Sequence, residues 1–312
     1  MIKLNEKEII KIFQNEFRNK KWISEDVEFF KVGKNMIAIK VDTLVESTDI
    51  PIKTKLYNIV RKSIVSCISD FAAKGVNPKY GIISLTIPRI FSKLKITQLA
   101  TAIGNISNEF NIKMLGGDTN EGKELVIETC LIGIAKKIIK RKSSRINDVI
   151  ISTGAFGYTS SGFNILYKDL KATAKFVKKT RNALLNPTSR LRFCIANSKY
   201  FSSAMDSSDG LSTTLHTMST QAKKKFVITN LPTNKDVINF AAKNDLDLIK
   251  LIFDGGEEYE VIATVKHSNL IKIKTSAILH KIELFEIGYV TRGNGVIYND
   301  MTIKDNGWLH LN

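Results

Sequence analysis

The sequence is poor in the residue types that many enzymes use for zinc binding or nucleophilic catalysis. Its 312 residues include three cysteines, Cys67, Cys130 and Cys194, and four histidines, His216, His267, His280 and His310. The cysteines lie far apart and match no zinc or redox spacing, and the histidines form no paired metal-binding or catalytic motif. These shortages exclude a recognisable zinc centre, a disulfide framework and a distinctive Cys–His nucleophile.

Long apolar runs are also missing. The most apolar segment, residues 125–135, is too short to span a bilayer and contains Glu128. The first residues show no apolar signal core. We therefore expect no membrane partner, and the odd number of dispersed cysteines suits a reducing compartment, so we expect a cytoplasmic protein. An apolar content of 43% with both signs of charge predicts a globular chain.

Acidic residues are fewer than basic ones. The chain contains 30 Asp and Glu and 47 Lys and Arg, which gives a net charge of +17. Such a charge leaves open a basic nucleic-acid-binding protein, whose affinity would fall steeply with salt. The lysines are dispersed, however, with only modest concentrations at 136–145, 175–181 and 223–225. We favour a solvated basic surface that attracts anionic substrates toward a cleft, and regard nucleic acid as the less favoured partner.

The common nucleotide-binding motifs are absent. The chain has no G-x-G-x-x-G loop and no protein-kinase signature. Residues 117–123 match G-x-x-x-x-G-K, but Glu124 occupies the position of the Ser or Thr. Two acidic side chains inside that loop would also repel the phosphates. If the protein binds phosphate, metal ions must therefore neutralise most of its charge.

The apolar spacing predicts an α/β (α+β) chain of two domains with mixed sheets and helices packed on one face. We expect helices at 6–17 and 56–73, strands at 36–41, 81–87 and 125–135, and a helix that ends near Phe110. Gly75 should stop the second helix. The basic connector 136–145 separates a first domain, 1–137, from a C-terminal α/β domain at 138–312. In that second half, 186–188 should cap one helix and 210–220 should form another.

The acidic residues that are present gather in five short clusters with small neighbours. These are Asp42-Thr43, Ser69-Asp70, Gly116-Gly117-Asp118, Asp206-Ser207-Ser208-Asp209-Gly210 and Gly255-Gly256-Glu257-Glu258-Tyr259-Glu260. Carboxylates at loop or strand ends are ligands for hard cations, and small neighbours allow close approach of a ligand. The set predicts several Mg²⁺ ions that hold a polyphosphate. A helix N-cap at Ser208 or Asp209, and simple turns at 116–118 and 255–257, remain the alternatives.

In order and spacing these clusters resemble the thiamine-monophosphate kinase family, within the aminoimidazole ribonucleotide synthetase-like superfamily. The similarity also includes Leu44-Val45-Glu46 and Ala72-Ala73-Lys74-Gly75-Val76-Asn77-Pro78, and it spans nearly the whole chain. The Gly-Gly-Glu-acid-Tyr-Glu element at 255–260 favours the thiamine branch of this superfamily. The resemblance implies two α/β domains, a homodimer formed through N-terminal sheets, and an ATP site in a cleft at the dimer interface.

The resemblance also implies roles for individual residues. The implied Mg²⁺ ligands are Asp26, Asp42, Thr43, Asp70, Asp118, Asp206 and Asp209. The implied ATP-binding residues are Gly117, Asp118, Arg141 and Ser208, and the implied substrate-binding residues are Asp49, Glu257, Trp308 and Leu311. Asp70 and Asp209 would act in catalysis through bound metal, without a general base.

Four positions depart from the family pattern. Ser24-Glu25-Asp26 replaces Gly-Asp-Asp, and Lys40-Val41 replaces the Ser-Thr before Asp42, which removes hydroxyl groups and adds a cation. Asp49 stands where bacterial members have histidine, and Leu311 replaces a terminal aromatic residue.

The activity that the resemblance implies is ATP-dependent phosphorylation of thiamine monophosphate to thiamine diphosphate, with several Mg²⁺ ions as cofactors. Another ATP-using member of the superfamily, such as an amide-activating or selenophosphate synthetase, is the enzymatic alternative. Selenide chemistry favours a reactive cysteine near the N-terminus, and no cysteine precedes Cys67.

Overall fold

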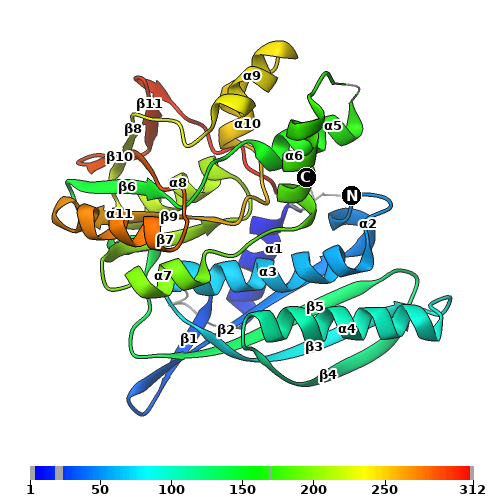
Figure 1. Ribbon diagram of the computed structural model, residues 1–312. Coiled ribbons are helices and arrows are strands. Elements are labelled where there is room, and N and C mark those ends of the chain that lie inside the picture. The colour runs from blue at the N-terminus through cyan, green and yellow to red at the C-terminus, as the bar shows by residue number, and fades with distance from the viewer. Residues whose placement is uncertain (1–3, 18–23, 169, 310–312) are drawn as a thin grey trace.

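The protein is described here by a computed structural model that covers residues 4–17, 24–168 and 170–309. Within these residues the strands form two mixed sheets, shown in Figure 1. The first sheet contains β1 (Glu28–Val32), β2 (Asn35–Val45), β3 (Pro78–Pro88), β4 (Lys113–Gly122) and β5 (Val126–Ala135), in the order β1-β2-β5-β3-β4. Its β3–β4 pair is parallel and its other pairs are antiparallel, which confirms the mixed pairing predicted from the sequence.

The second sheet follows the connector 136–147. It contains β6 (Asp148–Ser152), β7 (Phe201–Ser207), β8 (Lys225–Ile228), β9 (Glu260–Lys266), β10 (Phe285–Thr291), β11 (Val296–Tyr298) and β12 (Met301–Thr302). The strand order is β12-β11-β8-β10-β6-β9-β7. Ile150 and Ile262 face one apolar cluster, while the adjacent Ile151 and Ala263 face another, so apolar residues pack on both faces of this sheet.

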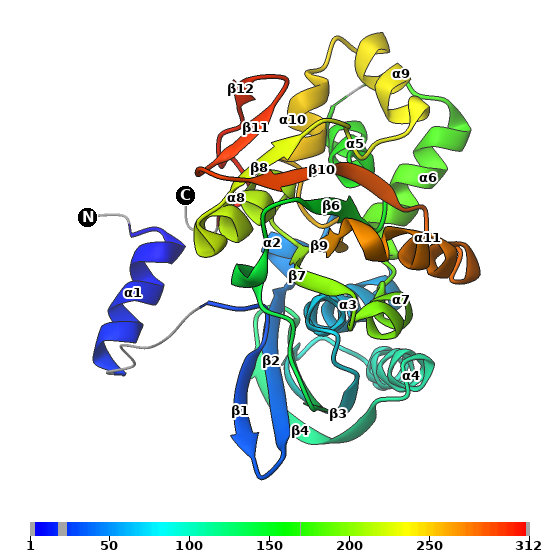
Figure 2. The ribbon, with the colours of Figure 1, turned by 90° about the vertical axis from the view of Figure 1, so that its left-hand side faces the viewer.

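The helices lie on and between the sheets. They are α1 (Glu6–Glu16), α2 (Glu46–Asp49), α3 (Leu56–Lys74), α4 (Lys93–Glu109), α5 (Tyr158–Tyr167), α6 (Ala174–Leu185), α7 (Leu191–Asn197), α8 (Leu211–Ala222), α9 (Lys235–Lys243), α10 (Leu248–Phe253) and α11 (Leu270–Leu279), with short 3-10 helices η1 (Arg141–Ser143) and η2 (His267–Asn269). Helices α3 and α4 cover one face of the first sheet, and α1 stands to one side (Figure 2). No described helix is long and apolar enough to cross a bilayer.

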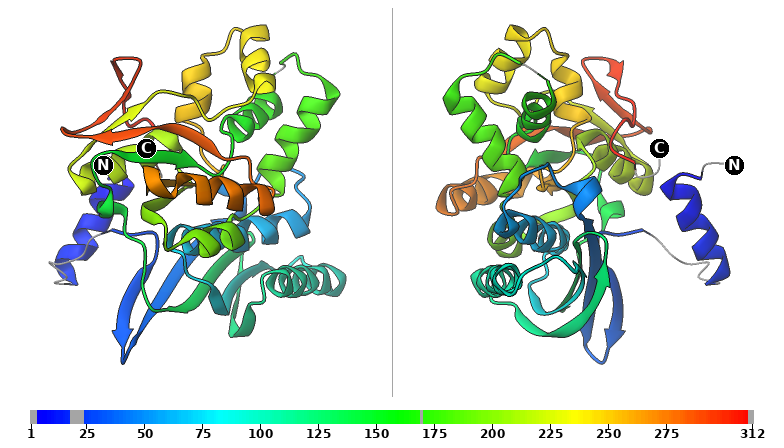
Figure 3. Two further views of the ribbon diagram at one scale, coloured as in Figure 1. Left: turned by 60° about the vertical axis from the view of Figure 1, so that its left-hand side comes forward. Right: turned by 90° about the vertical axis from the view of Figure 1, so that its right-hand side faces the viewer.

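Helix α3 lies between the two sheets, and the views in Figure 3 show the same layering from other sides. It packs against β2 and β5 of the first sheet and against β7 and β9 of the second. Its sequence predicts one apolar stripe, but the structure buries nearly its whole surface, including Lys62, Asp70 and Lys74. A helix enclosed by two sheets has little solvent-exposed surface, so its buried polar side chains must find partners inside the protein.

Several predicted helix ends can be compared with the structure. Gly75 ends α3 with φ +65°, and Val76 N donates to Phe71 O at 3.0 Å, as expected for a glycine C-cap. The predicted helix cap at 186–188 is wrong, because Asn186 ends α6 and α7 begins after Arg190. The N-cap alternative for Ser208 and Asp209 is also wrong, since Gly210 occupies that position without a side-chain cap.

Two strands differ from their predicted extent. Strand β2 continues to Val45, so Asp42 lies within a strand and not at its end. The Gly116-Gly117-Asp118 segment belongs to β4, which excludes both a simple turn and a phosphate loop at a helix start. A Cβ atom at Gly117 would lie 1.7 Å from the Ile83 carbonyl oxygen of β3, so glycine is required for this pairing.

The packing of α3 predicts a large effect for Phe71→Ala. Phe71 is fully buried, and its ring lies against Gly133 of β5, where a Cβ would meet it at 2.8 Å. The cavity should lower the free energy of unfolding by about 3–5 kcal/mol, measured by urea denaturation. Ile52→Ala is the control, because Ile52 is 89% exposed. Equal unfolding midpoints for the two variants would contradict the packing described here.

A second prediction concerns Glu258, in the loop before β9. Its Oε1 accepts hydrogen bonds from Gly157 N at 2.8 Å and Thr159 N at 3.0 Å. Burial raises the pKa of Glu258 from about 4.5 to about 7, and Glu260 adds to the rise. Between these pH values the folded protein holds a proton that the unfolded chain has released, so stability must fall as the pH rises through this window.

The variant Glu258→Gln keeps an acceptor for both amides but does not titrate. Relative to this variant, the wild type should lose on the order of 1–3 kcal/mol of unfolding free energy from pH 4.5 to pH 7. Urea denaturation at several pH values measures the difference. The exposed Glu283→Gln variant should follow the wild type, and a Glu258→Gln profile parallel to the wild type would contradict the prediction.

Candidate active site

Three carboxylates from distant parts of the chain meet between the two sheets. Asp26 precedes β1, Asp70 lies near the end of α3 and Asp206 lies in β7. One carboxylate oxygen of each lies within 4.8 Å of the others, and all three residues are buried. A compact set of carboxylate oxygens fits a hard divalent cation such as Mg²⁺. The sequence named all three as metal ligands, and the structure brings them together.

The repulsion within this group affects its protonation. Burial raises the pKa of Asp206 to about 6, and the charge of Asp26 adds to the rise. Burial, and then the neighbouring Asp206, raise the pKa of Asp70 well above its usual range. Ser69 donates to Asp206 Oδ2 at 2.7 Å, which favours the ionised form. The group therefore needs positive charge to remain ionised at neutral pH.

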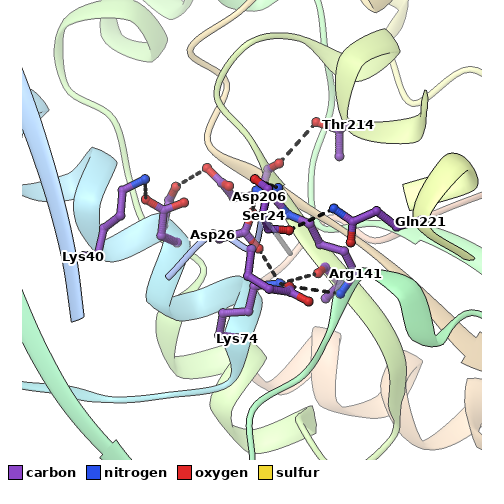
Figure 4. A network of polar contacts seen from close by, with 12 residues as sticks. Ser24, Asp26, Lys40, Lys74, Arg141, Asp206, Thr214 and Gln221 are labelled. Atoms are coloured by element: carbon purple, nitrogen blue, oxygen red, sulfur yellow. Dashed lines mark hydrogen bonds and ion pairs between the residues drawn. The ribbon is translucent and has the colours of Figure 1, made fainter. Parts of the chain in front are cut away.

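Two basic side chains supply charge to Asp26. Arg141 Nε lies 2.9 Å from Asp26 Oδ1, and Lys74 Nζ lies 2.7 Å from Oδ2. Although burial alone would raise it, these two cations hold the pKa of Asp26 below its ordinary value. Figure 4 shows Asp26 and Asp206 between Lys40 on one side and Arg141 on the other. Arg141, which the sequence assigned to ATP, is thus held by one of the proposed metal ligands.

A third cation connects Asp42 to the group. Lys40 Nζ lies 3.2 Å from Asp42 Oδ1 and 2.9 Å from Asp70 Oδ2. Burial lowers the pKa of Lys40, but Asp70 and Asp42 raise it more, so that it stands well above the ordinary value. Lys40 therefore carries its charge at neutral pH, and Asp42 reaches the three buried carboxylates through it.

A second group of predicted residues is joined by backbone hydrogen bonds between three loops. Glu257 N donates to Ser208 O at 2.6 Å, and Tyr259 N donates to Ser207 O at 3.0 Å. Trp308 N donates to Asp209 O at 2.8 Å. The segments expected to bind metal, ATP and substrate are therefore neighbours here. Glu257 and Tyr259 have positive φ values of 67° and 52°, a strained backbone of the kind found at ligand sites.

A buried lysine connects the two acidic residues assigned to substrate. Lys62 Nζ lies 2.6 Å from Glu257 Oε1 and 2.6 Å from the backbone oxygen of Asp49. The carboxylate of Asp49 accepts from Val45 N at 2.7 Å. Burial raises the pKa of Glu257, and Lys62 partly offsets this rise. Asp49 and Glu257 thus belong to one polar cluster against α3.

The structure places Thr43 and Asp118 elsewhere. Strand register aligns Thr43, Glu128, Ser84 and Asp118 in one row across β2, β5, β3 and β4. The next row contains Asp42, Thr129 and Ile83, whose side chains point toward α3. Because neighbouring residues of a strand point to opposite faces, Thr43 and Asp118 face away from α3. Within one chain they do not join Asp26, Asp70 and Asp206.

The C-terminal segment bears on two further assignments. Trp308 is 61% exposed and lies beside the loop of Asp209 through its backbone bond. A Cβ atom at Gly307 would lie 2.3 Å from Asp209 O, so this glycine permits the close approach. Leu311 lies outside the described residues, and its assignment to substrate stays a prediction.

The sequence analysis did not identify the lysines of α3 as part of the site. Lys62 and Lys74 bond to Glu257 and to Asp26, yet in sequence they read as polar residues on the outer side of an amphipathic helix. One feature of the sequence could have identified Lys74 as part of the site, namely its position between the Ser69-Asp70 cluster and Gly75. A lysine close to a buried carboxylate in sequence is a candidate partner for that carboxylate.

Comparison with known proteins identifies the family of this chain. Residues 24–135 match the family model of the AIR synthase related protein, N-terminal domain. A thiamine-monophosphate kinase from Nitrosopumilus maritimus is 50% identical over 315 residues, covering 100% of both chains. One from Buchnera aphidicola subsp. Acyrthosiphon pisum is 31% identical over 283 residues, covering 87% of this chain and 84% of its own length.

Solved structures share the fold at low sequence identity. The structure of AaThiL complexed with AMPPCP and TMP has a TM-score of 0.88 at 22% identity, and the match covers 99% of this chain and 98% of the other. The hydrogenase maturation protein HypE has a TM-score of 0.68 at 17% identity, with 90% and 89% covered. The predicted aminoimidazole ribonucleotide synthetase-like fold is therefore confirmed. With half of its residues identical to a kinase of this kind along the full length of both chains, the protein belongs to the thiamine-monophosphate kinase family.

Proposed function

We propose that the protein transfers the γ-phosphoryl group of ATP to thiamine monophosphate and forms thiamine diphosphate and ADP. The name of the relative from Nitrosopumilus maritimus and the AMPPCP and TMP in the AaThiL complex support this activity. Within this chain, the observation that carries the proposal is the convergence of Asp26, Asp70 and Asp206 within 4.8 Å.

The reaction makes one bond and breaks one. An oxygen of the thiamine monophosphate phosphate bonds to the γ-phosphorus, and the bond from that phosphorus to the β–γ bridging oxygen breaks, leaving ADP. The second pKa of a phosphate monoester is about 6, so the acceptor is largely ionised at neutral pH. No general base is needed, which agrees with a site built from carboxylates and lysines. The remaining difficulty is repulsion between two polyanions.

The carboxylates Asp26, Asp70 and Asp206 would hold Mg²⁺ here, because their oxygens suit this ion in number and type. Bound Mg²⁺ supplies positive charge to the phosphates. We assign Asp209 to the same function, together with the Asp42 oxygen that is not bonded to Lys40. Arg141 and Ser208 are assigned to the ATP phosphates. Arg141 touches Asp26 and so lies beside a nucleotide held at these carboxylates. Asp49, Glu257 and Trp308 are assigned to thiamine monophosphate, on the side of Lys62.

We further propose a cytoplasmic homodimer, with residues 1–137 as the ATP-binding and dimerisation domain and 138–312 as the second domain. The three cysteines are free, which suits a reducing compartment. The face of the first sheet that carries Thr43 and Asp118 also exposes Val41 (56%), Ile82 (39%) and Ile134 (45%). Exposed large apolar side chains on one sheet face are typical of an interface. In the dimer, Gly117 and Asp118 would contact ATP at that interface, and Thr43 and Asp118 would hold Mg²⁺ there.

The dimer predicts an effect of Ile82→Glu. A carboxylate on the apolar face would be buried unpaired at the interface, so the variant should sediment as a monomer and lose activity. Sedimentation velocity and the kinase assay measure both. Ile90→Glu is the control, because Ile90 is 90% exposed in a turn. A dimeric, fully active Ile82→Glu protein would contradict the interface.

Substitution of the proposed metal ligands tests the activity itself. Asp70→Asn and Asp209→Asn should each lower turnover by at least ~10²-fold at saturating Mg²⁺, comparable to loss of one strong electrostatic stabiliser. Formation of thiamine diphosphate from ATP and thiamine monophosphate is measured by chromatography. Asp236→Asn is the control, since this half-exposed residue pairs with Lys179 at 3.0 Å, away from the site.

Two outcomes would contradict these assignments. Near-normal turnover in both variants would remove the roles of Asp70 and Asp209. A wild type that consumes ATP with another acceptor, such as an amide or selenide, but forms no thiamine diphosphate would favour another member of the superfamily.

A further inference from the structure

The position of Lys40 differs from that of an ordinary surface lysine. Lys40 and Asp42 are two residues apart on β2, so both side chains leave the same face of the strand, toward α3. The ammonium nitrogen lies 3.2 Å from Asp42 Oδ1 and 2.9 Å from Asp70 Oδ2, and 26% of the Lys40 side chain is exposed. One cation thus bridges two carboxylates that come from different elements.

These two carboxylates depend on Lys40 for their counter-charge. Among the ion pairs formed by the described residues, those that reach Asp42 and Asp70 both come from Lys40. Lys74 and Arg141 are already engaged with Asp26. Without Lys40, Asp42 and Asp70 would face each other as two acids with no fixed cation between them.

The same space cannot hold a lysine and a metal ion together. Mg²⁺ binds oxygen at about 2.0–2.1 Å, well inside the separations that an ammonium group makes with carboxylates. A divalent ion that bridged the oxygens now bonded to Lys40 would have to displace the ammonium group. A tethered lysine, by contrast, stays at the site at any concentration of metal.

We propose that Lys40 is a built-in cation that takes the place of one divalent metal ion between Asp42 and Asp70. The inference rests on the proposed function in taking Mg²⁺ as the ion at the neighbouring carboxylates. Asp26, Asp70 and Asp206 keep their own metal position. The chain therefore binds one ion fewer than its carboxylates alone would hold, and Lys40 positions Asp42 and Asp70 in the absence of metal.

The test compares the wild type with Lys40→Met in the full-length protein. Mn²⁺ is the probe, and its unbound fraction is counted by electron paramagnetic resonance without nucleotide and with a non-hydrolysable ATP analogue. Lys40→Met should bind one additional Mn²⁺ per chain. Lys179→Met is the matched control, because Lys179 also pairs with an aspartate, Asp236, but 48% of its side chain is exposed. It should bind as the wild type does.

A second variant identifies the ligands of the additional ion. Lys40→Met combined with Asp42→Asn removes the lysine and one of the two acids, so the additional Mn²⁺ should be lost again. Persistence of the extra ion in this double variant would overturn the assignment. So would equal Mn²⁺ stoichiometry in the wild type and folded Lys40→Met.

Thermal unfolding keeps the proposal testable if Lys40→Met folds poorly. Without metal, the variant should melt below the wild type, since two acids are left unpaired. Saturating Mg²⁺ should close this gap, because the ion refills the position that Lys40 held. A gap of the same size with and without Mg²⁺ would show a purely structural lysine and overturn the proposal. Neither the Mn²⁺ stoichiometry nor the thermal unfolding involves phosphoryl transfer. Failure of the proposal for Lys40 is therefore distinguishable from failure of the proposed activity.

Discussion

Mutual repulsion among buried carboxylates is the constraint on which the structure around the site depends. Asp26, Asp70 and Asp206 lie closer together than ionised acids tolerate without counter-charge. The fold meets this need with cations from other elements, Lys74 of α3, Arg141 of η1 and Lys40 of β2. Because an unpaired buried charge costs several kcal/mol, each of these contacts also fixes the position of the element that supplies it.

Helix α3 pairs a buried lysine with a carboxylate at two places along its length. Lys62 holds Glu257 and the Asp49 backbone on the side assigned to the acceptor, while Lys74 holds Asp26 on the side of the clustered carboxylates. Lys74 follows Lys62 by twelve positions, which correspond to about 18 Å of helix at 1.5 Å per residue. A rigid element of that length sets the separation between the two parts of the site.

Local chemistry allowed much of this architecture to be predicted. Apolar spacing indicated α3, α4 and β5, and the glycine after Lys74 indicated where α3 ends. The acidic clusters named Asp70 and Asp206, the resemblance to the kinase family added Asp26, and these three aspartates do converge. Contacts between elements that are distant in the sequence could not be predicted. Nothing local shows that α3 is enclosed by two sheets, that Gly116-Gly117-Asp118 pairs with β3, or that Asp118 faces away from Asp70. Ion pairs such as Lys40 with Asp70 depend on contacts 30 residues apart and appear only in three dimensions.

The enclosed position of α3 also limits how the site can open and shut. Kinases with separate lobes commonly admit substrate through a hinge between them. Here the helix contributes side chains to the packing of both sheets, so a swing of one sheet against the other would expose the apolar core around Phe71. Access for substrate and exclusion of water must then come from short segments at the rim, namely the strained turn at 257–259 and the chain that crosses Asp209 at Trp308. We therefore expect any opening and closing of the site to occur in these short segments, with the two sheets and α3 fixed relative to one another.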